Sequence, residues 1–278
     1  MKNILNVVDV SAAMRVYHHN SRMANLSWVV DGKEVPTKAM YGVFQIFKRI
    51  ERGSKIVFCA DRRSVRKDVS EDYKKGRKPP DEDYIYQENE VERILRESRY
   101  NLLAEEGMEA DDLIGSVVTK YSDKYDKVLV WTNDRDLCYL INDKVEYKSL
   151  ITSLPDINVD NYEKVLKVPY NTISLFKATV GDSSDKIAGV RGFGMGSFDN
   201  LIEFCINMGI ELEDVVGNEE EIIKKFFDGR DAQIKQGLES LSLVKPILKD
   251  VTIEDREDSG NLRVELHRYG MKSVEARV

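Results

Sequence analysis

Three aspartates, Asp9, Asp61 and Asp134, each close a short apolar run that is rich in β-branched residues. Near-continuous apolar runs of this kind predict strands that are covered on both faces. The carboxyl ends of parallel strands meet at one edge of an open sheet, so we expect these three carboxylates to converge. Any single aspartate after a strand can equally be a turn residue or a helix cap. Three such aspartates after three predicted strands favour a shared site.

Six more acids lie in three short motifs, which are Glu109-Ala110-Asp111-Asp112, Asp134-Arg135-Asp136 and Gly181-Asp182-Ser183-Ser184-Asp185. Acids in a first helical turn complement the helix dipole, but three acids in four residues exceed that need. Carboxylates gathered this closely repel one another unless cations neutralise them, and oxygen-only ligands favour Mg²⁺ or Mn²⁺. The sequence therefore predicts a metal site built from nine carboxylates. They are Asp9, Asp61, Glu109, Asp111, Asp112, Asp134, Asp136, Asp182 and Asp185.

Other kinds of metal or redox site find no support in the sequence. The three histidines lack a His-x-x-x-His spacing, and the three cysteines lack zinc spacing and form no disulfide framework. This cysteine usage fits a reducing, cytosolic setting. The N-terminus reaches Asp9 too soon for a signal peptide, and no apolar run is long enough to cross a membrane. Mg²⁺ held by carboxylates typically bridges to substrate phosphates, and paired ions stabilise the attacking and leaving oxygens.

A strongly basic segment directly follows Asp61 and spans residues 62–78. It contains Lys74 and Arg77, with Tyr73 beside them. Charge runs are often merely solvated surface, and that interpretation stays open here. A cationic strip beside bound metals would engage a polyanionic backbone, and an embedded tyrosine could stack on a base. The net charge of −7 argues against a nucleic-acid partner, but removing the nine candidate ligands leaves the remainder slightly basic.

A glycine cluster, Gly189-Val190-Arg191-Gly192-Phe193-Gly194, lies between two helical patterns. A dinucleotide-binding interpretation fails because no predicted strand precedes it. Its position indicates a hairpin whose backbone N–H groups meet a phosphate at a helix N-terminus. Such an element would hold duplex DNA without reading its sequence.

The elements that must position these residues alternate between strand and helix in the first half of the chain. The predicted strands are residues 4–9, 56–61 and 128–134, with a weaker candidate at 100–104, and the predicted helices include 38–50, 83–98 and 111–121. This order predicts an α/β fold with a central, mostly parallel sheet flanked by helices. We expect a core at 1–160 with a basic arch at about 62–98. An all-helical region at 161–258, with helices around 219–227 and 232–244, and a polar tail at 259–278 would follow.

The chain resembles the 5′-nuclease family, which includes phage 5′→3′ exonucleases, the nuclease domain of bacterial DNA polymerase I and flap endonucleases. The resemblance runs from Asp9 to about Val251 and rests on the acidic motifs above, on Tyr73-Lys74-Lys75-Gly76-Arg77 and on residues 181–190. It implies a PIN-like 5′-nuclease core, a helical arch and a helix–three-turn–helix motif. It also implies that the nine acids hold two divalent cations.

The resemblance implies further roles, residue by residue. Lys74 and Arg77 match the catalytic basic pair at the base of the arch, and Tyr73 matches the stacking aromatic. Arg15 and Arg66 match nucleic-acid-binding residues. The implied duplex-binding glycines, at a site that often takes K⁺ in this family, are Gly189, Gly192 and Gly194. Two departures are Met195-Gly196-Ser197 in place of a lysine after the hairpin and a short connection from Asp61 to Tyr73.

The implied function is metal-dependent hydrolysis of DNA, as a 5′→3′ exonuclease and flap endonuclease that could also remove RNA primers during replication. The implied partners are DNA with 5′ ends, flaps or nicks, RNA–DNA hybrid, a replication polymerase or a single-strand-binding protein. We expect a monomer, and a phage-encoded enzyme fits the lack of a polymerase domain after it. A non-catalytic protein that binds branched DNA is the alternative, but all nine acids are present. A phosphatase with an aspartyl nucleophile is disfavoured because Asp9-Val10-Ser11 lacks the second acid.

Overall fold

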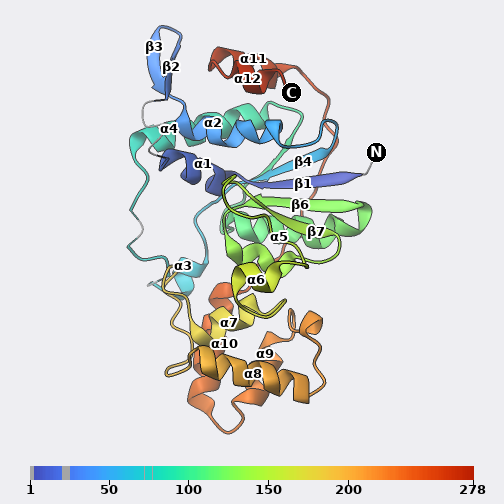
Figure 1. Ribbon diagram of the computed structural model, residues 1–278. Coiled ribbons are helices and arrows are strands. Elements are labelled where there is room, and N and C mark those ends of the chain that lie inside the picture. The colour runs from blue at the N-terminus through green and yellow to red at the C-terminus, as the bar shows by residue number, and fades with distance from the viewer. Residues whose placement is uncertain (1–2, 21–25, 72, 77) are drawn as a thin grey trace.

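The computed structural model describes residues 3–20, 26–71, 73–76 and 78–278. Its centre is a five-stranded parallel sheet with the order β5-β4-β1-β6-β7 (Figure 1). The strands are β1 (Ile4–Asp9), β4 (Lys55–Cys59), β5 (Asn101–Leu103), β6 (Lys127–Thr132) and β7 (Val145–Ser149). All four predicted strands are present. The unpredicted β7 is an edge strand, and its alternation of apolar and charged residues produces a weaker signal than a buried run.

Helices cover both faces of the sheet. On one face, α5 (Ala110–Tyr121) packs Leu113 and Val117 against Leu5 and Val7 of β1. The other face is covered by α1 (Val10–His18), α2 (Lys38–Phe44) with η2 (Gln45–Lys48), and α4 (Glu82–Arg96). Because both faces are buried, β1 and β4 read as continuous apolar runs. This is the predicted α/β architecture.

A second apolar core lies in the helical half of the chain, below the sheet in Figure 1. Its elements are α7 (Ile173–Val180), α8 (Met195–Asn207), η5 (Leu212–Asp214), α9 (Glu219–Phe226) and α10 (Asp231–Val244). The short helix α6 (Tyr162–Leu166) belongs instead to a smaller apolar cluster with Cys138 and Tyr147. The fully buried Leu201 and nearly buried Phe198 and Phe227 belong to this core. The helical half is present as expected, whereas the boundaries at residues 160 and 258 stay predictions.

The segment between β4 and α4 contains little regular structure. Its helix is α3 (Arg66–Val69), a single turn, and the remaining described residues are mostly turns and extended chain. The predicted helix 83–98 corresponds closely to α4. The segment therefore connects the sheet to α4 as a largely irregular arch (Figure 1).

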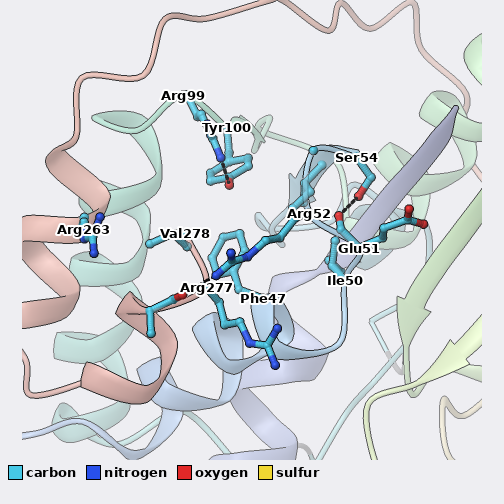
Figure 2. Close-up of a pocket in the computed structure, with 13 residues that line it drawn as sticks. Phe47, Ile50, Glu51, Arg52, Ser54, Arg99, Tyr100, Arg263, Arg277 and Val278 are labelled. Carbon is cyan, nitrogen blue, oxygen red and sulfur yellow. Dashed lines mark hydrogen bonds between the residues drawn. The ribbon is translucent and has the colours of Figure 1, made fainter. Parts of the chain in front are cut away.

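Two features that the sequence did not indicate lie at the opposite end from the helical half. A hairpin of β2 (Ser27–Val30) and β3 (Lys33–Pro36) projects beside α11 (Asn261–Arg268) and α12 (Lys272–Glu275) (Figure 1). The tail, which was expected only to be polar, packs Leu262, Leu266 and Val274 into the core beneath α2 and α4. A pocket near the beginnings of β4 and β5 is lined by Arg52, Arg99 and other arginines (Figure 2).

The remaining short helices are η3 (Ser122–Lys124), which extends α5, and η4 (Arg135–Leu140), which follows β6. Among the described residues, every helix is too short or too polar to traverse a lipid bilayer.

Candidate metal centre

The first pair of acids lies where adjacent strands β1 and β4 end. Asp9 caps α1, because its Oδ1 accepts a hydrogen bond from the Ala12 amide at 2.8 Å. Its Oδ2 accepts a second hydrogen bond from the Thr132 hydroxyl, also at 2.8 Å. Asp61 Oδ1 accepts from the Ala110 amide at 2.8 Å, at the start of α5. These bonds fix both carboxylates at the same edge of the sheet, as the strand pattern predicted.

Asp111 and Asp134 complete a group of four carboxylates with Asp9 and Asp61. All four line one open pocket of about 870 Å³, together with Lys74, Arg15 and residues of α1 and α4. Burial, and then the neighbouring Asp134, Asp9 and Asp61, raise the pKa of Asp111 well above its usual range. Burial and the charge of Asp61 raise the pKa of Asp9 to about 6. Crowded oxygen donors whose negative charges oppose one another suit hard divalent cations.

A second group consists of Asp136, Asp182 and Asp185, whose carboxylate oxygens lie within 4.8 Å of one another. Asp136 lies in η4 beyond β6, whereas Asp182 and Asp185 follow α7 in the helical half. Burial and the neighbouring Asp134 raise the pKa of Asp136 to about 7. The two halves of the chain therefore meet at this acidic group.

The group of four carboxylates and the group of three carboxylates adjoin each other. Asp111 lines the large pocket and also a small cavity of about 30 Å³, which Asp136, Asp185 and Glu109 line as well. Seven of the nine predicted ligands thus line the large pocket or belong to the group of three, and the other two, Glu109 and Asp112, line the small cavity between them. The chemistry of these donors fits the pair of divalent cations that the motifs imply.

Asp112 differs from the other predicted ligands in its surroundings. It is completely buried, and both of its oxygens bind Arg66, at 2.7 and 2.9 Å. Its Oδ2 also accepts from the Glu109 amide and its Oδ1 from the Ile247 amide. Asp112 thus makes four hydrogen bonds within the protein, and its role as a metal ligand stays a prediction. The sequence showed an acid in a first turn but could not show that an arginine 46 residues earlier would bind it.

Arg66 and Tyr73 are also buried and hydrogen-bonded within the protein. Both were expected to contact nucleic acid, yet they are only 5% exposed. Arg66 also reaches the Lys245 carbonyl, and the Tyr73 hydroxyl donates to Glu109 Oε2 at 3.0 Å. They attach the arch to the beginning of α5, and their contact with nucleic acid stays a prediction.

Glu109 is held by cations of the arch. Its Oε1 accepts from Lys74 Nζ at 2.6 Å and its Oε2 from Arg66 at 3.2 Å. Lys74 adopts a left-handed backbone conformation, with φ of 54°, and its amide donates to the Asp185 carbonyl. Lys74 therefore lies between the two acidic groups, on the wall of the large pocket.

Arg15 lies across the same pocket, where its Nη2 binds Asp61 Oδ2 at 2.8 Å and its side chain is 45% exposed. Burial disfavours the ionised form of Asp61, but the charge of Arg15 and the Ala110 amide outweigh it and lower the pKa of Asp61. Arg15 thus lies on the wall of the pocket with part of its side chain exposed. Arg77, the second predicted catalytic cation, lies outside the described residues.

The glycine cluster forms the connection between α7 and α8. Gly189 is buried with φ of 66°, and a side-chain carbon there would approach the Thr179 carbonyl to 2.7 Å. Gly192 and Gly194 are exposed, and Gly194 precedes the first turn of α8. Of the three glycines, the latter two present an exposed backbone, whereas Gly189 is required for close packing. Its contact with DNA stays a prediction.

Sequence reasoning missed two residues that hold the acids. The Thr132 hydroxyl connects Asp9 to the Asp134 amide, and Lys177 binds both Asp136 and Asp182. The missed signal was a single lysine within the otherwise apolar or small residues of α7.

The fold and this acidic edge define a nuclease of the type that uses divalent cations. A family model described as "5'-3' exonuclease, N-terminal resolvase-like domain" matches residues 5–167. The chain belongs to this family of hydrolases.

Two curated relatives show how much of the chain is shared. DNA polymerase I of Caldicellulosiruptor bescii is 34% identical over 179 residues, which are 61% of this chain and 21% of the polymerase. The 5'-3' exonuclease of Aquifex aeolicus is 28% identical over 255 residues, covering 87% of this chain and 85% of the relative. The chain thus spans about a fifth of the polymerase but most of the exonuclease.

Solved structures share the fold. The T5 D15 protein co-crystallised with metal ions has a TM-score of 0.57 and 19% identity, and the match covers 87% of this chain and all of that one. The catalytic core of Rad2 in complex with a DNA substrate has a TM-score of 0.58 and 16% identity, covering 99% and 91%.

Proposed function

We propose that the protein hydrolyses DNA phosphodiesters from 5′ ends, as a metal-dependent 5′→3′ exonuclease that also cuts 5′ flaps. The observation that carries this proposal is the convergence of Asp9, Asp61, Asp111 and Asp134 on one open pocket. Because these carboxylates are buried and repel one another, they favour the binding of divalent cations. The adjacent group around Asp136 supports a second cation, and Mg²⁺ or Mn²⁺ suits both.

Divalent cations held there would supply charge for the phosphate and lower the pKa of the attacking water. The protein's own groups set the geometry. The Ala12 and Ala110 amides and the Thr132 hydroxyl hold Asp9 and Asp61 with their remaining electron pairs available. Lys74 lies on the pocket wall, where exchange of Glu109 for a phosphate oxygen would place its ammonium on the developing negative charge. We assign the same role to Arg77, and initial attraction of the phosphate to Arg15.

We further propose that the exposed backbone at Gly192 and Gly194 contacts the duplex. The N-terminal end of α8 carries a partial positive charge and open N–H groups, which favour a phosphate. DNA with 5′ ends, flaps or nicks is the proposed substrate. Activity on RNA–DNA hybrid, K⁺ at the hairpin, a replication polymerase or single-strand-binding partner, a monomeric state and a cytosolic location stay predictions.

The decisive experiment incubates the protein with 5′-labelled duplex and 5′-flap DNA, in Mg²⁺ or in EDTA. We expect release of short 5′ products in Mg²⁺ alone. DNA binding without cleavage in Mg²⁺ or Mn²⁺ would contradict the proposal and favour a non-catalytic protein that binds branched DNA. A 3′-labelled strand serves as the control for polarity.

A further inference from the structure

Lys177 projects from α7 into the acidic group of Asp136, Asp182 and Asp185. Its ammonium binds Asp136 Oδ1 and Asp182 Oδ2 simultaneously, and its side chain is only 14% exposed. Asp182 and Ser184 are also hydrogen-bonded, through both the Ser184 amide and its hydroxyl. A cation from the protein itself therefore lies among the carboxylates that would bind a metal ion.

The ammonium occupies the space that a divalent ion bound to the same two oxygens, Asp136 Oδ1 and Asp182 Oδ2, would need. The three carboxylates offer oxygens within 4.8 Å of one another, and Nζ bridges two of them. A divalent ion at this group would lie about 2.0–2.6 Å from its oxygen ligands. Nζ cannot stay on the two oxygens at that separation, because two cations would then occupy one position.

The charges favour exchange over a permanent ion pair. Lys177 supplies a single positive charge to three carboxylates, and Asp134 adds a further negative charge beside Asp136. The group therefore stays strongly attractive to a divalent cation. The flexible four-carbon stem of lysine allows the ammonium to withdraw while α7 stays in place.

We propose that Lys177 is a tethered cation that holds Asp136 and Asp182 together before a divalent ion binds and that competes with this ion. The inference rests on the proposed function only in requiring that the acidic group binds an ion. Its consequence is that Lys177 weakens ion binding at this group, while stabilising the fold when no ion is present. Lys177 is thus a positioning residue that sets the affinity of the site.

The test compares Lys177→Met with Lys177→Arg by calorimetric titration with Mn²⁺ and by thermal unfolding in EDTA. Without the charge, Lys177→Met should bind Mn²⁺ more tightly at this group, roughly tenfold by the usual size of such couplings. Its midpoint in EDTA should fall, and saturating Mn²⁺ should raise it by more than in the wild type. Lys177→Arg keeps the charge and should resemble the wild type in affinity.

Asp185→Asn identifies the binding step that belongs to this group, because that step should weaken or disappear. Lys225→Met is the matched control, since Lys225 is a helical lysine paired with Glu221 in α9, away from the site. Equal Mn²⁺ affinity in Lys177→Met and the wild type, or weaker binding in the variant, would overturn the inference.

The two proposals fail separately. Mn²⁺ binding with no cleavage of DNA would reject the nuclease proposal and leave the competition measurable. Absence of Mn²⁺ binding in both the wild type and Lys177→Met would reject the tethered-cation inference and the metal centre together.

Discussion

Arg66 and Asp112 form a bidentate ion pair in the interior, with both side chains almost completely removed from solvent. The pair joins the arch to the first turn of α5, and Arg66 extends the connection to the Lys245 carbonyl. Contacts of this one pair therefore hold the basic arch, α5 and the segment after α10 together beside the acidic site.

Replacing Arg66 by Met should destabilise the protein, because it leaves the buried Asp112 charge without its partner. Breaking a buried pair in this way typically costs about 3–5 kcal/mol. Urea unfolding followed by circular dichroism would measure the loss. Arg63→Met is the control, since Arg63 and Asp68 form an exposed pair that should contribute under about 1 kcal/mol. Equal free energies of unfolding in the two variants would show that the buried pair does not stabilise the fold more than the exposed pair does.

Asp134→Asn should abolish cleavage while largely preserving DNA binding. The amide removes a negative charge from the pocket where the cation is proposed to bind, and we expect a loss in rate on the order of 10²–10³ or more. Single-turnover cleavage of a labelled flap and fluorescence anisotropy separate the two effects. Asp123→Asn, at an exposed aspartate paired with Lys144, should behave like the wild type. Retained turnover in Asp134→Asn would remove this residue from the metal centre.

Lys74→Ala should slow cleavage far more than it weakens binding, because the proposed contact strengthens as negative charge develops on the phosphate. We expect a fall in single-turnover rate on the order of 10²-fold, with affinity for DNA changed only slightly. Lys67→Ala tests an exposed lysine in the same basic segment and should leave the rate unchanged. An unaltered rate in Lys74→Ala would exclude this lysine from the chemistry.

The gain in thermal stability from Mg²⁺ should increase with pH. Burial and neighbouring carboxylates raise the pKa of Asp9 to about 6 and of Asp136 to about 7, whereas an unfolded aspartate titrates near 3.8. The folded state therefore binds these protons more tightly than the unfolded state does. Without ions, the stability of the protein thus falls as the pH rises from near 3.8 to about 7. Lys177 and Ser184 outweigh burial and lower the pKa of Asp182 to about 2. This shift makes stability increase with pH, but only at pH values below the window in which Asp9 and Asp136 titrate.

Differential scanning fluorimetry in EDTA and in Mg²⁺, at about pH 5 and about pH 8, would measure the effect. Mg²⁺ should raise the unfolding midpoint little at the lower pH, where the acids are protonated, and more at the higher pH. Asp136→Asn should reduce the difference between the two conditions. A gain from Mg²⁺ that is independent of pH would contradict the coupling between these acids and the ion.

The sequence by itself determined the parallel sheet and the edge where its chemistry lies. Runs such as residues 4–8 are apolar apart from Asn6, because strands buried on both faces need apolar side chains on both. The acid that follows such a run marks the end of the strand. The position of α5 after the Glu109-Ala110-Asp111-Asp112 motif was predictable for a similarly local reason, since acids favour a first helical turn.

Tertiary structure alone decided which charged groups face the pocket and which neutralise one another in the interior. Asp111 and Asp112 are adjacent in a helix, yet one lines the pocket and the other binds Arg66, because successive helical residues point in different directions. Lys177 meets Asp136 only because α7 packs beside η4, a contact between segments 41 residues apart. The local sequence pattern predicts at which strand end or helix start a carboxylate lies. Which group the carboxylate binds depends on how distant segments pack.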